Sequence, residues 1–174
     1  CSVRRQRQMC IRDRYKDLFF VFHSTQEHVQ LLQKQLLDEG LKNCGAIADE
    51  KIKSHILKSS VFAVAKSGTI SLEICNSKIP SIIIYKMGTI NFFIVKMLVK
   101  VKFANIINIA AGEEVIPELL QSKCNAKDIY NTVDKLMNDK TALENQLNKT
   151  QSIISNFKTD KSSEIASSIL KDYI

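Results

Sequence analysis

Short apolar runs alternate with amphipathic segments along the first half of the chain. Continuous apolar runs are typical of parallel strands that are buried on both faces, and residues 18–22 and 61–65 are clear examples. The segments between the runs repeat apolar residues at the spacing of one helix face. The pattern therefore predicts strands at 18–22, 44–48, 61–65 and 81–85, and helices at 25–39, 50–58, 70–76 and 89–103.

The second half of the chain is mainly helical in its pattern. Residues 105–112 are small and predict a strand or a loop, whereas 115–121 predict a helix with Pro117 in its first turn. Further helices are expected at 126–138, at 141–157 and from near Ser162 onward. Strands that alternate with helices indicate right-handed βαβ units. We therefore expect an α/β fold, with a parallel sheet flanked by helices and an all-helical C-terminal tail.

The positive charge is unevenly distributed along the sequence. The formal net charge is +7, and every arginine lies within the first 14 residues. One interpretation is a basic arm for nucleic acid or anionic lipid. The abrupt end of arginine usage after Arg14 favours a foreign stretch instead, such as a translated cloning scar. We therefore interpret residues 1–14 as a basic leader that is not native to the domain, and assign the functional domain to residues 15–174.

Cysteine usage predicts a reducing compartment and argues against a metal site, and hydropathy argues against a membrane-spanning segment. The five cysteines form no C-x-x-C pair and share no ligand spacing with the three histidines. This predicts reduced thiols in a cytosolic protein and no metal site. The most apolar stretch, 90–101, is interrupted by Lys96 and Lys100, so it is too polar to span a bilayer. Its basic and apolar faces are compatible with a membrane surface or with a packed core.

The best candidate for chemistry is Ser67-Gly68-Thr69, between a predicted strand and a predicted helix. Ligands of doubly wound folds bind at the carboxyl ends of strands, where a glycine admits a phosphate and a helix N-terminus attracts it. Glu73, one turn further on, could accept hydrogen bonds from a ribose diol. The alternatives are an ordinary helix cap and a surface glutamate. The pair predicts a nucleotide held by both phosphate and ribose.

A second candidate spans residues 108–121. Asn108, the small residues after it and Gly112 form an anion-friendly turn before the helix predicted at 115–121. Glu118 and Gln121 would then share one helix face and could bind polar groups of a ligand. The alternative is a loop followed by an ordinary solvated helix.

Several of these segments together resemble a known family. They are AKSGTISLE at 65–73, Pro80, YK at 85–86, LVKVKF at 98–103 and NIAAGEEVIPELLQ at 108–121. In order and spacing they resemble the carboxyl-terminal half of the lipid-A-disaccharide synthase family, over about residues 15–174. Ile107 and Glu113 depart from the family's pattern, because proline and arginine are usual there.

The resemblance implies an inverting glycosyltransferase with two Rossmann-like domains, the GT-B fold, of which this chain is the carboxyl-terminal half. Such enzymes transfer 2,3-diacylglucosamine from UDP to 2,3-diacylglucosamine 1-phosphate and form the lipid A disaccharide. The acceptor site and the general base are expected in the missing amino-terminal half, so we expect the fragment to be inactive alone. Carried over to this sequence, the family's donor site comprises Ser67, Gly68 and Thr69 for the diphosphate, Glu73 for the ribose, Asn108 and Gly112 as pocket lining, and Glu118 and Gln121 for polar groups of the donor.

The resemblance also implies partners and a location. The partners are the UDP-2,3-diacylglucosamine donor, the lipid acceptor and the inner-membrane surface, with no nucleic acid, metal or cofactor, and a homodimer is left open. The location is cytoplasmic and peripheral at the inner membrane. Three alternatives remain: another UDP-N-acetylglucosamine-type transferase or epimerase, a basic nucleic-acid-binding module that uses the arginines, and a non-catalytic interaction domain that kept the fold.

Overall fold

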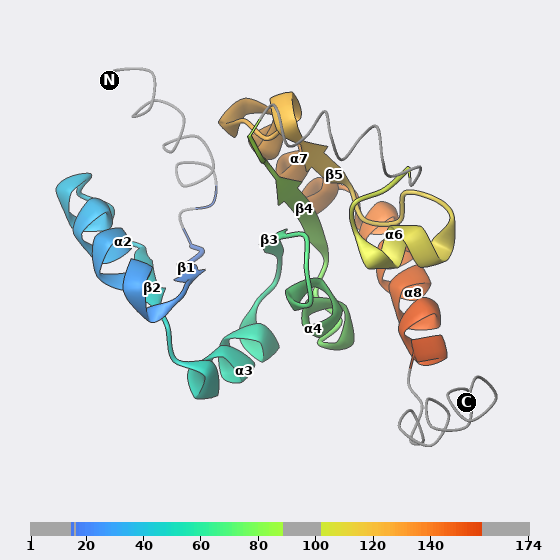
Figure 1. Cartoon of the computed structure of the whole chain (residues 1–174), viewed down its shortest axis with the longest axis horizontal. Helices are drawn as coiled ribbons and strands as arrows, with labels where there is room; N and C mark the ends of the chain where they lie inside the picture. Colours follow the sequence, from blue (N-terminus) through green and yellow to red (C-terminus); the bar gives the residue numbers. More distant parts are fainter. Residues whose placement is uncertain (1–14, 16, 89–101, 158–174) are drawn as a thin grey trace, which may run out of the picture.

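The computed structural model describes Tyr15, residues 17–88 and residues 102–157 of the 174-residue chain. The leader 1–14, the helix predicted from Ser162 onward and nearly all of the helix predicted at 89–103 therefore lie outside the described residues. Within them, parallel strands alternate with helices in the first half of the chain, and two long helices end it (Figure 1).

The first strands form a two-stranded parallel sheet. It consists of β1 (Phe20–His23) and β2 (Cys44–Ile47), joined by α2 (Gln26–Asp38). The strands and the helix confirm the prediction, but the expected burial of 18–22 on both faces is wrong. Val21 is 37% exposed and Phe22 is 42% exposed. The reason is that β1 has β2 as its strand neighbour among the described residues, and α2 buries none of its own side chains.

A second parallel sheet has the strand order β3-β4-β5. It is reached through α3 (Glu50–Ser59), and α4 (Ile70–Asn76) connects β3 (Ala63–Lys66) to the central strand β4 (Ser81–Tyr85). All four elements lie close to their predicted positions. The strand at 61–65 is buried on one face alone: Ala65 is buried, whereas Val64 is 45% exposed because β3 is an edge strand of this sheet.

The core lies on both faces of β4. Its consecutive residues Ile82 and Ile83 point to opposite faces of the sheet, and both are fully buried. Ile82 packs in a cluster with Val133 and Leu136 of α7 (Ala126–Asn138). Ile83 packs in the other cluster, with residues of α4, α6 (Ile106–Ala111) and α8 (Lys140–Phe157). The sheet is therefore a central layer with α7 and the first turn of α8 on one face, and α4, α6 and the rest of α8 on the other (Figure 1).

The segment 105–121 differs from the prediction in both of its parts. Residues 106–111, expected as a strand or loop, form α6, which is capped by the Asn105 side chain and ends at Gly112 in the left-handed region with φ of +70°. Residues 115–121, expected as a helix, instead form a bend at 115–116, the strand β5 (Glu118–Leu120) and the start of a 3₁₀ turn at Gln121–Lys123. Pairing of β5 with β4 satisfies its backbone and overrides the local helical pattern.

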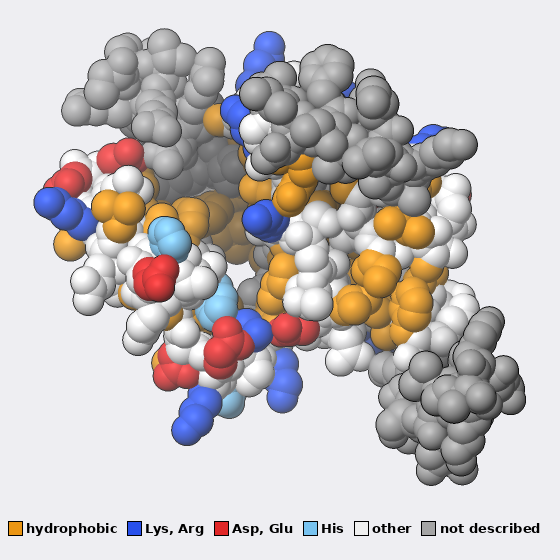
Figure 2. Space-filling model, in the orientation of Figure 1, with side chains coloured by type: hydrophobic (Ala, Val, Ile, Leu, Met, Phe, Trp, Pro, Cys, Tyr) orange, Lys and Arg blue, Asp and Glu red, His pale blue; other side chains and the backbone are white. Residues whose placement is uncertain are grey.

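Hydrophobic side chains also reach the surface. In Figure 2 they gather on the side of the molecule that carries α6, where Ile106 is 45% exposed and Ile109 is 46% exposed. Within the described ranges, no helix combines the length and the hydropathy needed to cross a bilayer.

Candidate functional site

The first candidate motif forms the turn between β3 and α4. Gly68 has open space around it, because a Cβ atom added there would meet no heavy atom of the described residues within 4 Å. The Ser67 hydroxyl donates a hydrogen bond of 2.7 Å to the Ala104 carbonyl oxygen. Thr69 occupies the N-cap position of α4, but its side chain makes no capping hydrogen bond. The motif is therefore not an ordinary side-chain cap: its glycine is accessible and the Thr69 hydroxyl is exposed.

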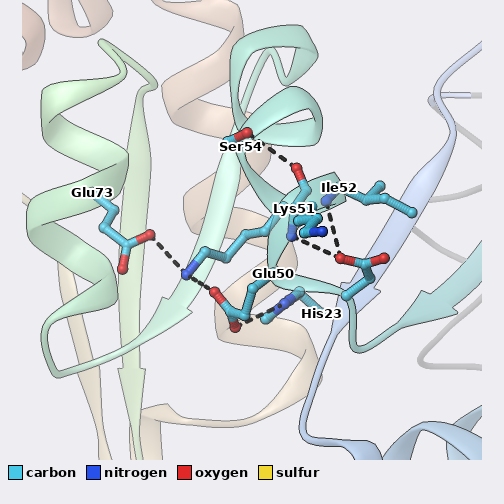
Figure 3. A network of polar contacts seen from close by, with 8 residues as sticks. His23, Glu50, Lys51, Ile52, Ser54 and Glu73 are labelled. Carbon is cyan, nitrogen blue, oxygen red and sulfur yellow. Dashed lines mark hydrogen bonds and ion pairs between the residues drawn. The ribbon is translucent and has the colours of Figure 1, made fainter.

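Glu73 of α4 points toward α3 (Figure 3). Its Oε2 lies 2.9 Å from Lys53 Nζ, and the same ammonium lies 2.5 Å from Oε2 of Glu50. His23, the last residue of β1, approaches the other oxygen of Glu50 at 3.5 Å. These four side chains join the end of β1, the first turn of α3 and the first turn of α4. We call them the carboxylate–lysine network.

The electrostatics of the network follow from these contacts. The hydrogen bond from Lys53 lowers the pKa of Glu50, and the hydrogen bonds to Glu50 and Glu73 raise the pKa of Lys53. Both shifts favour the charged forms, so Glu50 and Lys53 form an ion pair at neutral pH. Solvent screens it, because the side chains of Glu50 and Glu73 are 69% and 44% exposed.

Local sequence explains where Lys53 lies. Asp49 follows β2 and caps α3, since its Oδ1 accepts hydrogen bonds from the backbone of Lys51 at 2.7 Å and of Ile52 at 3.4 Å. The cap starts α3 at the carboxyl end of the strand, which places Lys53 in its first turns. Sequence reasoning missed Lys53; its i, i+3 spacing from Glu50 was the available signal.

Asn108 is a fully buried residue of the second candidate motif. Its Oδ1 accepts hydrogen bonds from the backbone of Val115 and Ile116, both at 2.9 Å. Its Nδ2 donates to the Ile116 carbonyl at 2.7 Å and to Glu118 Oε1 at 2.8 Å. All four hydrogen-bonding positions of the amide are used inside the protein. Asn108 therefore fixes the path of residues 115–116 relative to α6.

Glu118 does not share a helix face with Gln121, which corrects the sequence prediction. Glu118 lies in β5, opposite Ile83 of β4. Its carboxylate accepts hydrogen bonds from the backbone N–H of Ala104 at 2.8 Å and of Asn105 at 2.9 Å, in addition to the bond from Asn108. Three donors stabilise the negative charge of this partly buried side chain and hold the start of α6.

Gln121 lies after β5 in a backbone conformation with positive φ of +50°. Its Oε1 accepts a hydrogen bond from Met87 N at 2.9 Å, and its Nε2 donates to Met87 O at 3.3 Å. The amide therefore clamps the segment that leaves β4. Gly112 has open space around it and ends α6.

The structure brings the two candidate motifs together through Ala104. The Ala104 carbonyl accepts from Ser67, and its N–H donates to Glu118. Next to it, Asn105 is fully buried, and its Nδ2 has no hydrogen-bond partner among the residues that the structure describes. Neither Ala104 nor Asn105 was singled out from the sequence, since their roles depend on backbone atoms and on contacts between distant segments.

Two other predictions concern cysteine and metal chemistry. Cys75 is 2% exposed, and burial raises the pKa of its thiol to about 11. It is therefore a small buried apolar residue that stays protonated at neutral pH. In the part of the chain that the structure describes, no group of three or more His, Cys, Asp or Glu side chains could hold a metal ion.

The strands, crossovers and turns define an α/β protein of the Rossmann-like type, with its candidate binding groups at the carboxyl ends of parallel strands. A family model described as Lipid-A-disaccharide synthetase matches residues 6–171. The chain therefore belongs to the lipid-A-disaccharide synthetase family. The match begins inside the arginine-rich leader, at residue 6.

Curated relatives carry the same description. The lipid-A-disaccharide synthase of Rickettsia typhi is 35% identical over 160 residues, which cover 90% of this chain and 42% of that protein. The synthase of Sulfurihydrogenibium sp. is 34% identical over 140 residues, which cover 76% of this chain and 36% of that protein. The chain thus spans about two fifths of the length of the relatives that it matches.

Proposed function

We propose that this chain is the donor-binding part of a glycosyltransferase of lipid A biosynthesis. The whole enzyme would transfer 2,3-diacylglucosamine from UDP to 2,3-diacylglucosamine 1-phosphate and release the lipid A disaccharide. The observation that carries the proposal is the junction of the Ser67–Gly68–Thr69 turn with the 104–118 segment at the carboxyl end of β3. This is the edge at which open α/β sheets bind ligands, and the family match supports the substrate.

The diphosphate of UDP would bind at Gly68 and Thr69. Gly68 leaves room for a close approach of the phosphate to the backbone. The exposed Thr69 hydroxyl can donate to a phosphate oxygen. Ser67, whose hydroxyl is bonded to Ala104, would hold the turn against the second motif. Negative charge on the departing UDP would be stabilised by these fixed donors.

The second motif would shape the donor pocket through the backbone that it holds. Asn108, Glu118 and Gln121 direct their polar atoms to backbone groups of 87, 104–105 and 115–116. Gly112 would keep the end of α6 open. Direct contact of these four residues with the donor stays a prediction. In the first motif, Glu73 would accept a hydrogen bond from the ribose.

The acceptor site and the general base belong, in this proposal, to the part of the relatives that the chain does not span. The chain alone would therefore bind UDP without transferring a sugar. The exposed Ile106 and Ile109 of α6 support a surface that touches lipid at the cytoplasmic face of the inner membrane. A homodimer remains a prediction.

Calorimetric titration with UDP tests the donor site. Thr69→Glu places a carboxylate beside the proposed diphosphate position, and repulsion should weaken UDP binding by at least about tenfold, which corresponds to about 1.4 kcal/mol. Asn76→Glu is the matched control, because it adds the same charge at the exposed far end of the same helix. No UDP binding by the unsubstituted chain, or equal affinities for the two variants, would contradict the proposal.

A further inference from the structure

Glu73 is held by one of its two carboxylate oxygens. Oε2 lies 2.9 Å from Lys53 Nζ, whereas Oε1 has no hydrogen bond or ion pair within the described segments. The side chain is 44% exposed, so solvent or a ligand can reach it. A carboxylate with one oxygen fixed and one available is suited to accept a hydrogen bond from a ligand hydroxyl.

Lys53 is the less exposed partner of this ion pair. Its side chain is 17% exposed, and its ammonium bridges Glu73 of α4 and Glu50 of its own helix. Two carboxylates, one from α3 and one from α4, restrain the ammonium of the long lysine side chain. Lys53 thereby restrains Glu73, which would otherwise lose rotamer freedom when a ligand binds.

The topology of the sheets puts this pair at the ligand-binding edge. Lys53 lies in the helix that follows β2, and Glu73 lies in the helix that follows β3. Both helices begin at the carboxyl ends of parallel strands, and Glu73 is one turn after Thr69. The Lys53 amine therefore contacts Glu73 from a neighbouring helix and is not part of the turn proposed to bind the diphosphate.

We propose that Lys53 is a positioning residue for ribose recognition: it holds Glu73 through Oε2 and presents Oε1 to a ribose hydroxyl of the nucleotide. This inference rests on the proposed function, because it assigns the residue that orients one contact of the same UDP site. Lys53 itself touches neither the sugar nor the diphosphate.

The competing explanation is a strap between α3 and α4 with no role in recognition. The two explanations differ in one measurable property, the dependence of affinity on the ribose hydroxyls. A strap that only stabilises the fold would affect a nucleotide with hydroxyls and one without them equally. A positioning residue would affect only the nucleotide that has them.

The test is calorimetric titration of the full chain with UDP and with 2′,3′-dideoxyuridine diphosphate. Lys53→Met should weaken UDP binding by about tenfold, the effect of a weakened charged hydrogen bond, and should change the affinity for the dideoxy nucleotide by less than about twofold. Glu73→Gln should behave in the same way, and the double variant should be no weaker than Glu73→Gln. Lys53→Arg, which keeps a cation in place, should restore most of the affinity for UDP.

Lys51→Met is the matched control, because it removes the same charge from the same turn of α3. In the described structure Lys51 bonds to Asp49 through its backbone N–H, which the substitution leaves in place. It should leave both affinities unchanged. Equal losses for both nucleotides in Lys53→Met, or no loss for either, would overturn the positioning role while leaving UDP binding intact. Failure of the unsubstituted chain to bind UDP would overturn the proposed function itself. Circular dichroism of each variant verifies that it is folded.

Discussion

In the second motif, the side chains of Asn108 and Glu118 hydrogen-bond to backbone groups and so set the geometry of the backbone around them. Together they receive or donate the hydrogen bonds that fix 104–105 and 115–116. Buried polar side chains of this kind are held in one orientation because each polar atom must find a partner. They determine where the segment beside the Ser67–Thr69 turn runs, and so how wide that corner of the domain is.

Substitution of Glu118 by glutamine tests this interpretation. Glu118→Gln keeps the size of the side chain, but one carboxylate oxygen becomes an amide donor that faces the donors of 104, 105 or 108. We expect the free energy of unfolding to fall by about 2 kcal/mol, measured by urea denaturation. Glu114→Gln is the control, because Glu114 is exposed and, within the described part of the chain, accepts one hydrogen bond, of 3.1 Å. A Glu118→Gln chain as stable as the control would contradict the role of the carboxylate.

At the scale of elements, the two sheets differ in how well they are packed. The central strand β4 contains the fully buried Ile82 and Ile83, whereas β1 contains no buried residue. Both strands have continuous apolar sequences, so their intrinsic preferences are alike. The difference arises from their neighbours: β4 pairs on both sides and has helices over both faces, while β1 pairs with β2.

Hydrogen exchange measures this difference. We expect backbone amides of β1 and β2 to exchange at least about a hundredfold faster than those of β4, because few apolar contacts oppose local opening of the first sheet. Mass spectrometry of peptides that cover 18–23 and 81–85 gives both rates in one experiment. Equal protection of the two peptides would show that the sheets open as one cooperative unit.

At the scale of the whole molecule, the candidate groups come from several elements between residues 23 and 121 of the described chain. The carboxylate–lysine network, the 67–69 turn and the 104–121 segment lie near the carboxyl ends of successive strands. Tyr15 also connects distant parts, since its hydroxyl donates to Asp134 of α7 at 3.0 Å. The leader 1–14 precedes all of these groups in sequence.

Deletion of residues 1–14, with Tyr15 retained, separates nucleotide binding from nucleic-acid binding. The affinity for UDP should change by less than about twofold, since the proposed site lies in 53–121. Any salt-dependent binding of the intact chain to DNA or RNA should be lost, because the deletion removes all five arginines. The two affinities can be measured by calorimetry and by fluorescence anisotropy at several salt concentrations. Salt-dependent nucleic-acid binding that survives the deletion would place that activity in the domain itself.

The sequence by itself determined the alternation of strands and helices, the position of α4 and α7, and the turn that contains Gly68. These features depend on local patterns: apolar runs, helical spacing, and glycine between a strand and a helix. Only the tertiary structure decided that 118–120 is a strand, that Glu118 and Asn108 bind backbone, and that Lys53 holds Glu73. Each of these depends on partners outside its own helix or strand, and a pairing strand or a facing helix can reverse a weak local preference.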